Sequence, residues 1–345
     1  MELNCPVPIT DYDRILMAHG GGGRLMHQLL DKMIYQEFRN EFLDQNHDGA
    51  LLPVPGKKLA FTTDSFVVNP IFFPGGNIGD LAINGTINDL VCCGAKPLYL
   101  SLAFIIEEGL LMEDFWKIIQ SIKSAVQKAG VKIVTGDTKV VERGKGDGIF
   151  INTTGIGELY SGQEINPVNC KPGDVVIING AIAEHGIAIM SRREGLQFEA
   201  DVVSDSASLN EMMQEVFEHC KDIHVLRDPT RGGLASTLNE IAQVSGTGIT
   251  LNENNLPVNE TVKGACELLG FDPLYVANEG KILVILPEKS ADIVLQIMKK
   301  YPEGESSTVI GKVHSEYPGK VQLETVIGSK RIVDMISGEQ LPRIC

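Results

Sequence analysis

The chain has 345 residues, a length that suggests two domains of ordinary size. Its composition, 43% hydrophobic and 22% charged, is typical of a soluble globular protein. The formal net charge of −15 argues against partners such as nucleic acid or an anionic membrane surface, because their phosphates would repel it.

The seven cysteines predict free thiols, not a disulfide framework or a zinc site. Their number is odd, no C-x-x-C pair occurs, and Cys92 and Cys93 are adjacent. Free thiols are typical of a reducing compartment. The N-terminus lacks the apolar segment of a secretory signal, and the longest apolar run, 98–106, is too short to span a bilayer. We therefore expect a cytoplasmic protein that does not enter a membrane.

The first half opens on a run of four glycines that leads into an amphipathic segment, 24–30. These glycines are Gly20, Gly21, Gly22 and Gly23. Free N–H groups at a helix N-terminus suit an anion, as does the helix dipole. Neither a Walker A loop nor a Rossmann fingerprint matches, since no G-K-[ST] follows and Leu25 takes the place of the third glycine. From this stretch alone, an anion cradle and a flexible hinge are equally supported.

Strands and helices then alternate, and three of them carry an aspartate. Hydrophobic patterning predicts strands at 58–64, 97–107, 131–137 and 148–158, and helices at 77–94 and 113–129. The aspartates are Asp64, Asp89 and Asp137. Carboxylates at element ends, completed by water and phosphate oxygens, usually hold Mg²⁺. Each alone suits a cap or a turn, but with the glycine loop they predict a magnesium–nucleotide site, with Lys139 in reach of a phosphate.

A proline-bearing break at 161–171 predicts a domain boundary. The second half is predicted to contain strands at 174–180, 248–251 and 281–286 and near 309 and 321, and helices at 184–193, 208–219, 234–244, 258–269 and 290–300. Asp228 and Arg231 precede a glycine pair and a helix. A cation and backbone N–H groups therefore converge on a second anion or a substrate.

The chain ends in L-P-R-I-C, with Cys345 as its last residue. Pro342 has a fixed φ and no N–H donor, so it resists joining a helix or a sheet. This ending predicts a mobile arm that carries a thiol. Arg343 favours the reactive thiolate, whereas the terminal carboxylate opposes it.

Together these motifs resemble the HypE family of [NiFe]-hydrogenase maturation proteins, within the aminoimidazole-ribonucleotide-synthetase (PurM-like) ATPase superfamily. Most of the motifs are shared across the superfamily, and the terminal P-R-I-C is the specific element. The matching stretches cover essentially the whole chain: His19 with 20–23, then 63–64, 88–89, 136–139, 184–186, 228–233, 278–280 and 342–345.

The resemblance implies a PurM-like two-domain α/β (α+β) fold. Residues 1–40 would form a segment with the glycine-rich loop, and 41–165 an ATP-binding domain whose strands form a barrel-like sheet across a homodimer. Residues 166–334 would form a C-terminal α/β domain, and 335–345 a mobile tail.

The resemblance also implies an ATP-dependent carbamoyl dehydratase. The Cys345 thiol would receive a carbamoyl group from the carbamoyltransferase HypF, and the carboxamide oxygen would attack the γ-phosphate of ATP. Loss of phosphate and an N–H proton would leave a thiocyanate, which supplies cyanide for the hydrogenase iron on a HypC–HypD scaffold complex.

The implied roles fall into three groups. Mg²⁺ would be held by Asp64, Asp89 and Asp137. ATP and substrate would be bound by Gly20, Gly21, Gly22, Gly23, Asn88, Asp228 and Arg231. Glu279 and Lys139 are both candidates for the proton step, and the sequence does not choose between them.

Other members of the superfamily fit less well. In selenophosphate synthetase a reactive Cys precedes a glycine-rich motif, whereas Cys5 is followed by P-V-P. Thiamine-phosphate kinase and aminoimidazole-ribonucleotide synthetase would give Cys345 no purpose. A non-catalytic carrier of a thiol-bound group would need neither the aspartates nor the glycine loop.

Overall fold

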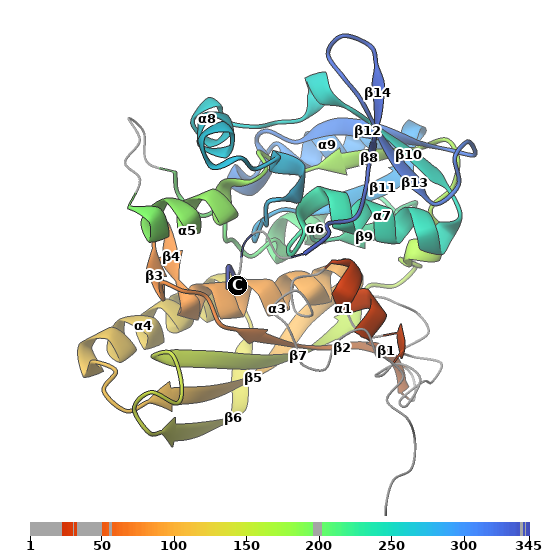
Figure 1. Cartoon of the computed structure of the whole chain (residues 1–345). Helices are drawn as coiled ribbons and strands as arrows, with labels where there is room; N and C mark the ends of the chain where they lie inside the picture. The colour runs from red at the N-terminus through yellow and green to blue at the C-terminus, as the bar shows by residue number, and fades with distance from the viewer. Residues whose placement is uncertain are drawn as a thin grey trace, which may run out of the picture.

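The computed structural model describes residues 23–29, 31–32, 50–54, 57–195, 202–338, 341 and 343–345. They form two mixed α/β domains, one above the other in Figure 1, and the C-terminus lies between them. The predicted α/β class and two-part architecture are confirmed.

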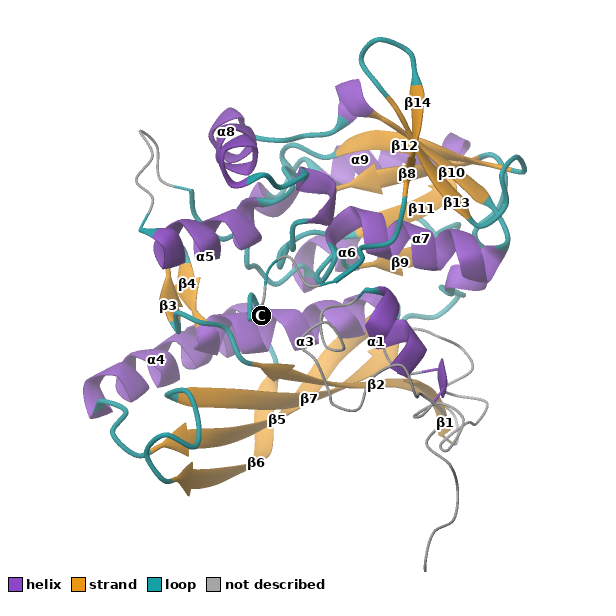
Figure 2. Ribbon diagram, in the orientation of Figure 1, coloured by secondary structure: helices purple, strands orange, loops and turns teal. Residues whose placement is uncertain are grey.

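The N-terminal domain is a five-stranded sheet with two long helices on one face, as Figure 2 shows. The strand order is β1-β2-β7-β5-β6, and β5 and β6 run parallel. The strands are β1 (Ala50–Val54), β2 (Lys57–Phe66), β5 (Ala95–Glu107), β6 (Lys132–Val141) and β7 (Ile149–Leu159). The helices are α1 (Arg24–Leu29), α3 (Ile78–Cys92) and α4 (Met112–Ala129), and β3 (Phe72–Phe73) and β4 (Gly76–Asn77) form a small hairpin.

Helix α3 is the central element, because it lies between the sheet and the second domain. Its start is fixed by a capping box: the Asn77 side chain accepts from the Gly79 N–H, and the Asp80 side chain accepts from the Asn77 N–H. Nearly all of its residues are buried. Asn84 and Asn88 on this helix bond to the second domain, whereas Thr86 bonds to Thr153 of the sheet.

The C-terminal domain contains a seven-stranded sheet in the order β14-β13-β10-β12-β8-β11-β9. Its central strands β8 (Asp174–Ile178) and β11 (Leu283–Pro287) are continuous apolar runs, as expected of strands covered on both faces. The other strands are β9 (Val225–Arg227), β10 (Gly248–Asn252), β12 (Thr308–His314), β13 (Lys320–Glu324) and β14 (Lys330–Val333). The helices are α5 (Glu184–Glu194), α6 (Asn210–His219), α7 (Gly233–Ser245), α8 (Glu260–Leu269) and α9 (Ala291–Met298).

Two strands extend further than predicted. β2 continues past Asp64 to Phe66, and β6 continues past Asp137 to Val141, so neither acid ends its strand. The short strands β1, β9 and β14 were not predicted, because three to five residues carry little periodicity of their own.

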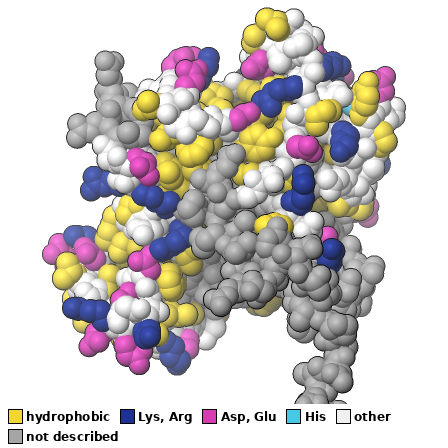
Figure 3. All heavy atoms as spheres, in the orientation of Figure 1, with side chains coloured by type: hydrophobic (Ala, Val, Ile, Leu, Met, Phe, Trp, Pro, Cys, Tyr) yellow, Lys and Arg dark blue, Asp and Glu magenta, His cyan; other side chains and the backbone are white. Residues whose placement is uncertain are grey.

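Figure 3 shows positive and negative side chains interspersed over the described part of one face. Across the described ranges, no helix combines the length and the apolar character that crossing a bilayer requires.

Asn88 on α3 joins the two domains. Its Nδ2 donates to the carbonyl oxygens of Ala207 (2.9 Å) and Glu279 (3.1 Å), and its Oδ1 accepts from the Leu209 N–H (3.0 Å). Both amide hydrogens are thus used, and the side chain is 1% exposed. The structure therefore gives Asn88 a role between the domains, and its predicted contact with a cofactor stays a prediction.

We predict that Asn88→Ala lowers the free energy of unfolding by about 3 kcal/mol, because three buried backbone groups each lose a partner at roughly 1 kcal/mol. Asn84→Ala is the matched control: Asn84 lies on the same helix and donates to Ser206 Oγ across the interface (3.1 Å). That control should lose about 1 kcal/mol. Urea unfolding followed by circular dichroism measures both losses, and equal losses would contradict the role of Asn88 in joining the two domains.

Candidate active site

The last residues of the chain lie in the interface and pair with the segment that follows β2. The Val67 N–H donates to a main-chain oxygen of Cys345 (3.0 Å), and the Asn69 N–H donates to the carbonyl oxygen of Arg343 (3.2 Å). Arg343 Nε in turn donates to the Val67 carbonyl oxygen (3.1 Å), and its guanidinium forms an ion pair with Asp147. Two backbone hydrogen bonds therefore hold the tail, although Arg343, with a left-handed φ of 56°, lies in a turn and not in a strand.

Apolar contacts explain why this segment docks although Pro342 precedes it. Ile344 is 3% exposed and belongs to the hydrophobic core, and Leu341 packs against the same core. Burying such side chains contributes roughly 1.5–3 kcal/mol each. The structure gives the tail a seated position, and its departure from that position stays a prediction.

The docked thiol lies in a cluster of ionisable groups that come from both domains. Burial raises the pKa of the Cys345 thiol to about 12; Arg231 acts in the opposite direction, while Glu279, Asp64 and Asp228 raise the pKa further. The sequence singled out all five residues, and the structure brings them together. We call them the tail cluster.

Arg231 is the cation of this cluster. Its pKa is raised first by the Cys345 sulfur and then by Asp64, Glu279 and Asp89, although desolvation acts in the opposite direction. Its loop is held open by two glycines with left-handed φ, 75° at Gly232 and 59° at Gly233. A Cβ on Gly233 would lie 2.5 Å from a backbone oxygen, so only glycine fits there.

Glu279 is the unusual acid of the cluster. It is 4% exposed, and its Oε1 has no hydrogen-bond partner in the described part of the chain. Its pKa is raised well above its ordinary value, first by burial and then by Asp64 and Asp228. A buried polar atom without a partner is rare in a folded protein and marks a place for a ligand group.

A buried ion-pair network holds Glu279 in place, and the sequence analysis missed it. The Asp205 carboxylate accepts from the N–H groups of Glu279 (3.2 Å) and Gly280 (3.3 Å). Lys281 Nζ lies 3.1 Å from Asp205 and 3.3 Å from Glu184. The available signal was Lys281 itself, because a lysine at the start of an apolar strand needs a buried partner.

Asp64 and Asp89 lie close together at the junction of β2 and α3. Thr62, two residues before Asp64, donates its hydroxyl to Asp89 Oδ2 (2.8 Å). A Cβ on Gly85, one helical turn before Asp89, would lie 3.9 Å from Asp64 Oδ2. These contacts place Asp64 and Asp89 on neighbouring parts of β2 and α3 within one chain, and the metal that they are expected to share stays a prediction.

Asp137 and Lys139 lie elsewhere, which corrects the expected three-aspartate site. β6 is three strands away from β2, about 14 Å at ordinary strand spacing. Asp64 pairs with Thr153, which is buried beneath α3. Thr153 lies opposite Leu102 of β5, and Leu102 lies opposite Gly136 of β6, so Gly136 is on the same face as Asp64. Asp137 follows Gly136 and therefore points to the opposite face of the sheet.

Asp137 and Lys139 form an exposed ion pair there, at 3.1 Å. Within the described residues, no three His, Cys, Asp or Glu side chains are grouped to hold a metal ion. The three aspartates therefore do not share a site inside a single chain.

The glycine run is described only at its end. Gly20, Gly21 and Gly22 lie outside the described residues, so their predicted closure over phosphates is untested. Gly23 packs against the start of the tail, where a Cβ would lie 2.6 Å from the Ile336 carbonyl oxygen. The Arg24 N–H donates to that oxygen (3.2 Å).

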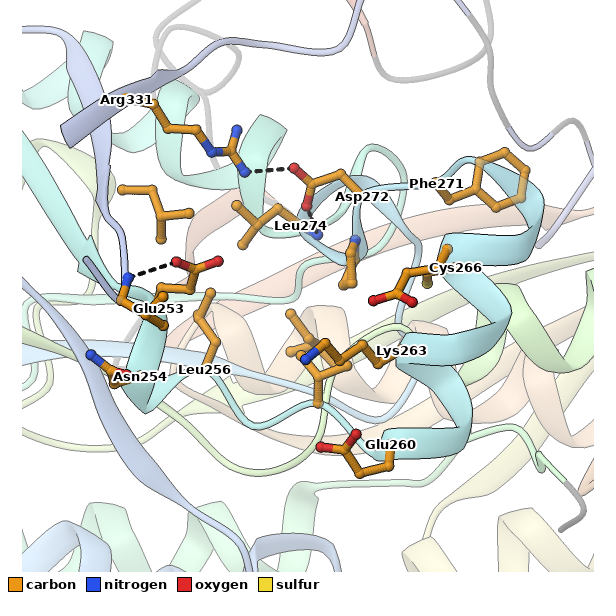
Figure 4. Close-up of a pocket in the computed structure, with 16 residues that line it drawn as sticks. Glu253, Asn254, Leu256, Glu260, Lys263, Cys266, Phe271, Asp272, Leu274 and Arg331 are labelled. Carbon is orange, nitrogen blue, oxygen red and sulfur yellow. Dashed lines mark hydrogen bonds and ion pairs between the residues drawn. The ribbon is translucent and has the colours of Figure 1, made fainter. Parts of the chain in front are cut away.

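A separate cavity of about 410 Å³ lies on the outer part of the second domain. Figure 4 shows Lys263 and Cys266 of α8 on one side and an Asp272–Arg331 ion pair of 2.6 Å at the rim. No residue of the tail cluster lines it. The cavity is therefore distinct from the candidate site.

Comparison with known proteins shows the family of this chain. The family model for AIR synthase related protein, N-terminal domain, matches residues 46–159, and the model for its C-terminal domain matches 171–324. Carbamoyl dehydratase HypE of Azotobacter vinelandii is 49% identical over 329 residues, covering 95% of this chain and 96% of the relative. The chain belongs to the HypE family. Carbamoyl dehydratase HypE of Escherichia coli K12 is 42% identical over 338 residues, covering 96% and 100%.

Solved structures of the family have the same fold. HypE in complex with ATP has a TM-score of 0.82 at 48% identity, covering 96% of this chain and 100% of that one. A HypE–HypF complex has a TM-score of 0.86 at 49% identity, covering 89% and 99%. The chain titled AaThiL complexed with AMPPCP and TMP, at 18% identity, 94% and 99% coverage and a TM-score of 0.69, shares the fold alone. The resemblance and the PurM-like fold inferred from the motifs are confirmed.

We predict that tail docking weakens at alkaline pH. Burial raises the pKa of the docked thiol to about 12, whereas a free thiol titrates near about 8.5. A group that favours its neutral form when docked stabilises docking fully below the free pKa. Above that pH the equilibrium constant for docking falls about tenfold per pH unit, until the pKa of the docked thiol is reached.

The measurement is the alkylation rate of Cys345 divided by that of a free peptide with the same last six residues. This ratio should stay low and constant up to about pH 8.5 and then rise. A ratio that does not change with pH would show that the thiol titrates normally in the folded protein.

Proposed function

We propose that this chain is an ATP-dependent carbamoyl dehydratase that converts a carbamoyl group on Cys345 into a thiocyanate, the source of cyanide for the iron of [NiFe]-hydrogenase. The observation that carries the proposal is the docked tail, whose thiol lies with Arg231, Glu279 and Asp64. Relatives named carbamoyl dehydratase, of nearly equal length, support it.

The proposed reaction balances without an oxidant or a reductant. The carboxamide oxygen on sulfur attacks the γ-phosphate of ATP, and ADP leaves. The C–O bond then breaks with phosphate as the leaving group, and both N–H protons are lost, which leaves S–C≡N. Phosphorylation is needed because oxide is a poor leaving group and phosphate is a good one.

Residues of the tail cluster supply the polar groups for these steps. Arg231 offsets negative charge on the phosphorylated group beside the sulfur. Glu279 is a candidate to take an N–H proton, since a carboxylate with a raised pKa is the stronger base. Lys139 is the other candidate, and it would act from a second copy of the chain.

The acids at the β2–α3 junction fit Mg²⁺. Asp64 and Asp89 offer oxygen ligands, and burial raises the pKa of Asp64, so a cation beside it would favour its ionised form. Bound there, Mg²⁺ would offset charge on the ATP phosphates. Asp228 and the glycines Gly20 to Gly23 are the proposed neighbours of the nucleotide, and a HypE structure with ATP supports the choice of nucleotide.

A homodimer would bring the strand that carries Asp137 and Lys139 next to the strand that carries Asp64. β1 pairs with residues 57–61 of β2, which leaves 62–66 without a strand neighbour on that side in the described structure. β6 is the opposite edge of the same sheet. A twofold-related copy that lays its β6 along this part of β2 closes both edges into a barrel with four strands from each chain.

The proposed barrel also covers an apolar surface. Phe61, Tyr99 and Ile105 are 41%, 45% and 47% exposed and lie on the face of the sheet that points away from α3. In the barrel this face becomes the interior. Asp137 and Lys139 of one copy then lie on the strand next to Asp64 of the other copy, with their side chains on the opposite face of the sheet.

HypF is the proposed source of the carbamoyl group, and the HypE–HypF complex among the similar structures supports that choice. A HypC–HypD complex as acceptor and a cytoplasmic location follow from the resemblance and stay predictions.

Mass mapping of the C-terminal peptide tests the proposed reaction. With HypF, carbamoyl phosphate and ATP, the peptide should gain one carbamoyl group on Cys345 and then lose one water. Asp64→Asn should load normally but lose water at least about 100-fold more slowly, because it removes a charge and keeps the shape. Asp222→Asn, an exposed acid paired with Lys289, is the matched control. A carbamoyl adduct on another residue would contradict the assignment.

Mixed dimers test the shared site. We predict that Asp64→Asn and Asp137→Asn are each inactive, yet co-expressed chains recover about one quarter of wild-type activity. Half of the random dimers are mixed, and each mixed dimer carries one intact site of two. Sedimentation confirms that dimers form. Mixed dimers without activity would mean that both aspartates act within one chain.

A further inference from the structure

His185 binds the tail through its backbone and is not part of the reacting cluster. It lies in the first turn of α5 and is fully buried. Its Nε2 lies 2.9 Å from the Ile344 carbonyl oxygen, and its Nδ1 lies 2.7 Å from Ser204 Oγ. The edge of its ring meets Phe73 at a centroid distance of 5.5 Å, which fixes the ring plane.

The partners of His185 determine its tautomer. A carbonyl oxygen only accepts, so Nε2 must carry the hydrogen, and Nδ1 must accept from the Ser204 hydroxyl. Ser204 Oγ accepts in turn from the Ser206 N–H (3.1 Å). One directed chain of hydrogen bonds therefore runs from the 204–206 loop to the tail. Burial lowers the pKa of His185, which agrees with a neutral ring.

Arg193, in the last turn of the same helix, binds the neighbouring carbonyl. Its Nη2 donates to the Arg343 carbonyl oxygen (3.0 Å), and its Nε donates to that of Asn69 (3.1 Å). Asn69 also pairs with Arg343 through its N–H. Arg193 thus donates to one backbone carbonyl on each of the two paired segments.

Both contacts are made to backbone carbonyls, so they do not depend on what the sulfur carries. The same helix is tied to the proposed proton acceptor. Glu184, beside His185, pairs with Lys281, which pairs with Asp205 beneath the Glu279 backbone. Tail seating and Glu279 placement therefore share one support.

We propose that His185 and Arg193 form a latch, a pair of positioning residues that sets how much of the time the tail is seated between the domains. The latch holds the thiol, or a group on it, against the tail cluster, and its release exposes the thiol to the partner that loads it. The seating role stands on the contacts above. Its consequence for water loss rests on the proposed function.

The test measures exposure of Cys345 without using activity. Its alkylation rate by iodoacetamide at neutral pH is followed by peptide mass mapping. A Cys5→Ser background removes the cysteine outside the described residues, and Cys92, Cys93, Cys170, Cys220 and Cys266 are buried. Arg193→Ala and His185→Phe should each raise the rate about tenfold, the effect of losing one hydrogen bond to a charged or buried donor.

Three further variants separate a latch from general loosening. Arg192→Ala, an exposed neighbour on α5, should leave the rate unchanged. His185→Gln keeps a donor and should restore most of the slow rate. The double latch variant should be faster than either single one. If His185→Phe does not fold, as judged by its thermal melt, Arg193→Ala alone decides.

Loading with HypF, carbamoyl phosphate and ATP then tests the consequence. Latch variants should load faster than wild type, by the factor seen in alkylation, because both steps need the unseated tail, and they should lose water more slowly only where the unseated tail becomes the major form. Wild-type alkylation rates in folded latch variants would overturn the latch. Raised alkylation with a wild-type loading rate would overturn its link to the reaction. If wild type itself loses no water, the proposed function fails, while the alkylation result still decides the latch.

Discussion

The pairing of the last three residues with the segment after β2 is the contact on which the rest of the site depends. Val67 and Asn69 hold the backbone of Cys345 and Arg343, and Asp64 lies three residues earlier on the same strand. One stretch of chain therefore supplies both an acid of the site and the seat of the thiol. Backbone hydrogen bonds therefore fix where the Cys345 backbone lies relative to the strand that carries Asp64.

The second constraint is the crowding of acids around that seat. Asp64, Asp228 and Glu279 surround the thiol with Arg231, and burial raises the pKa of the sulfur and of Glu279. Such a group of carboxyls lowers the stability of the fold when its charges are not offset. The hydrogen bond from Asn88 to the Glu279 carbonyl and the Asp205–Lys281 ion pair hold the surrounding backbone in place. A nucleotide with its metal ion and a carbamoylated sulfur are the ligands whose charges and hydrogen bonds would complete it.

Much of the site was predictable because its residues lie at glycine turns and element ends, where local sequence shows special backbone needs. Arg231, Glu279 and Asp64 were found in this way. The position of Asp137 was not, because its face and its distance from Asp64 follow from strand order and register, which depend on pairings between distant segments. The resting position of the tail was not predictable, since Pro342 suggested a mobile arm while the burial of Ile344 depends on a core built by both domains. Asn88 was predicted to bind ATP or substrate because a polar residue on an apolar helix faces either a binding site or an interface. Hydrophobic periodicity does not distinguish the two.

Dehydration at Cys345 requires the carbamoyl oxygen to leave with the phosphate of ATP. The most direct measurement is to load the protein through HypF with a carbamoyl group that carries a heavy oxygen isotope, add ATP, and analyse the phosphate by mass spectrometry. We predict one labelled phosphate for each thiocyanate formed on Cys345, and no labelled phosphate from Cys345→Ala. Thiocyanate formed together with unlabelled phosphate would contradict phosphorylation of the amide oxygen in the docked state.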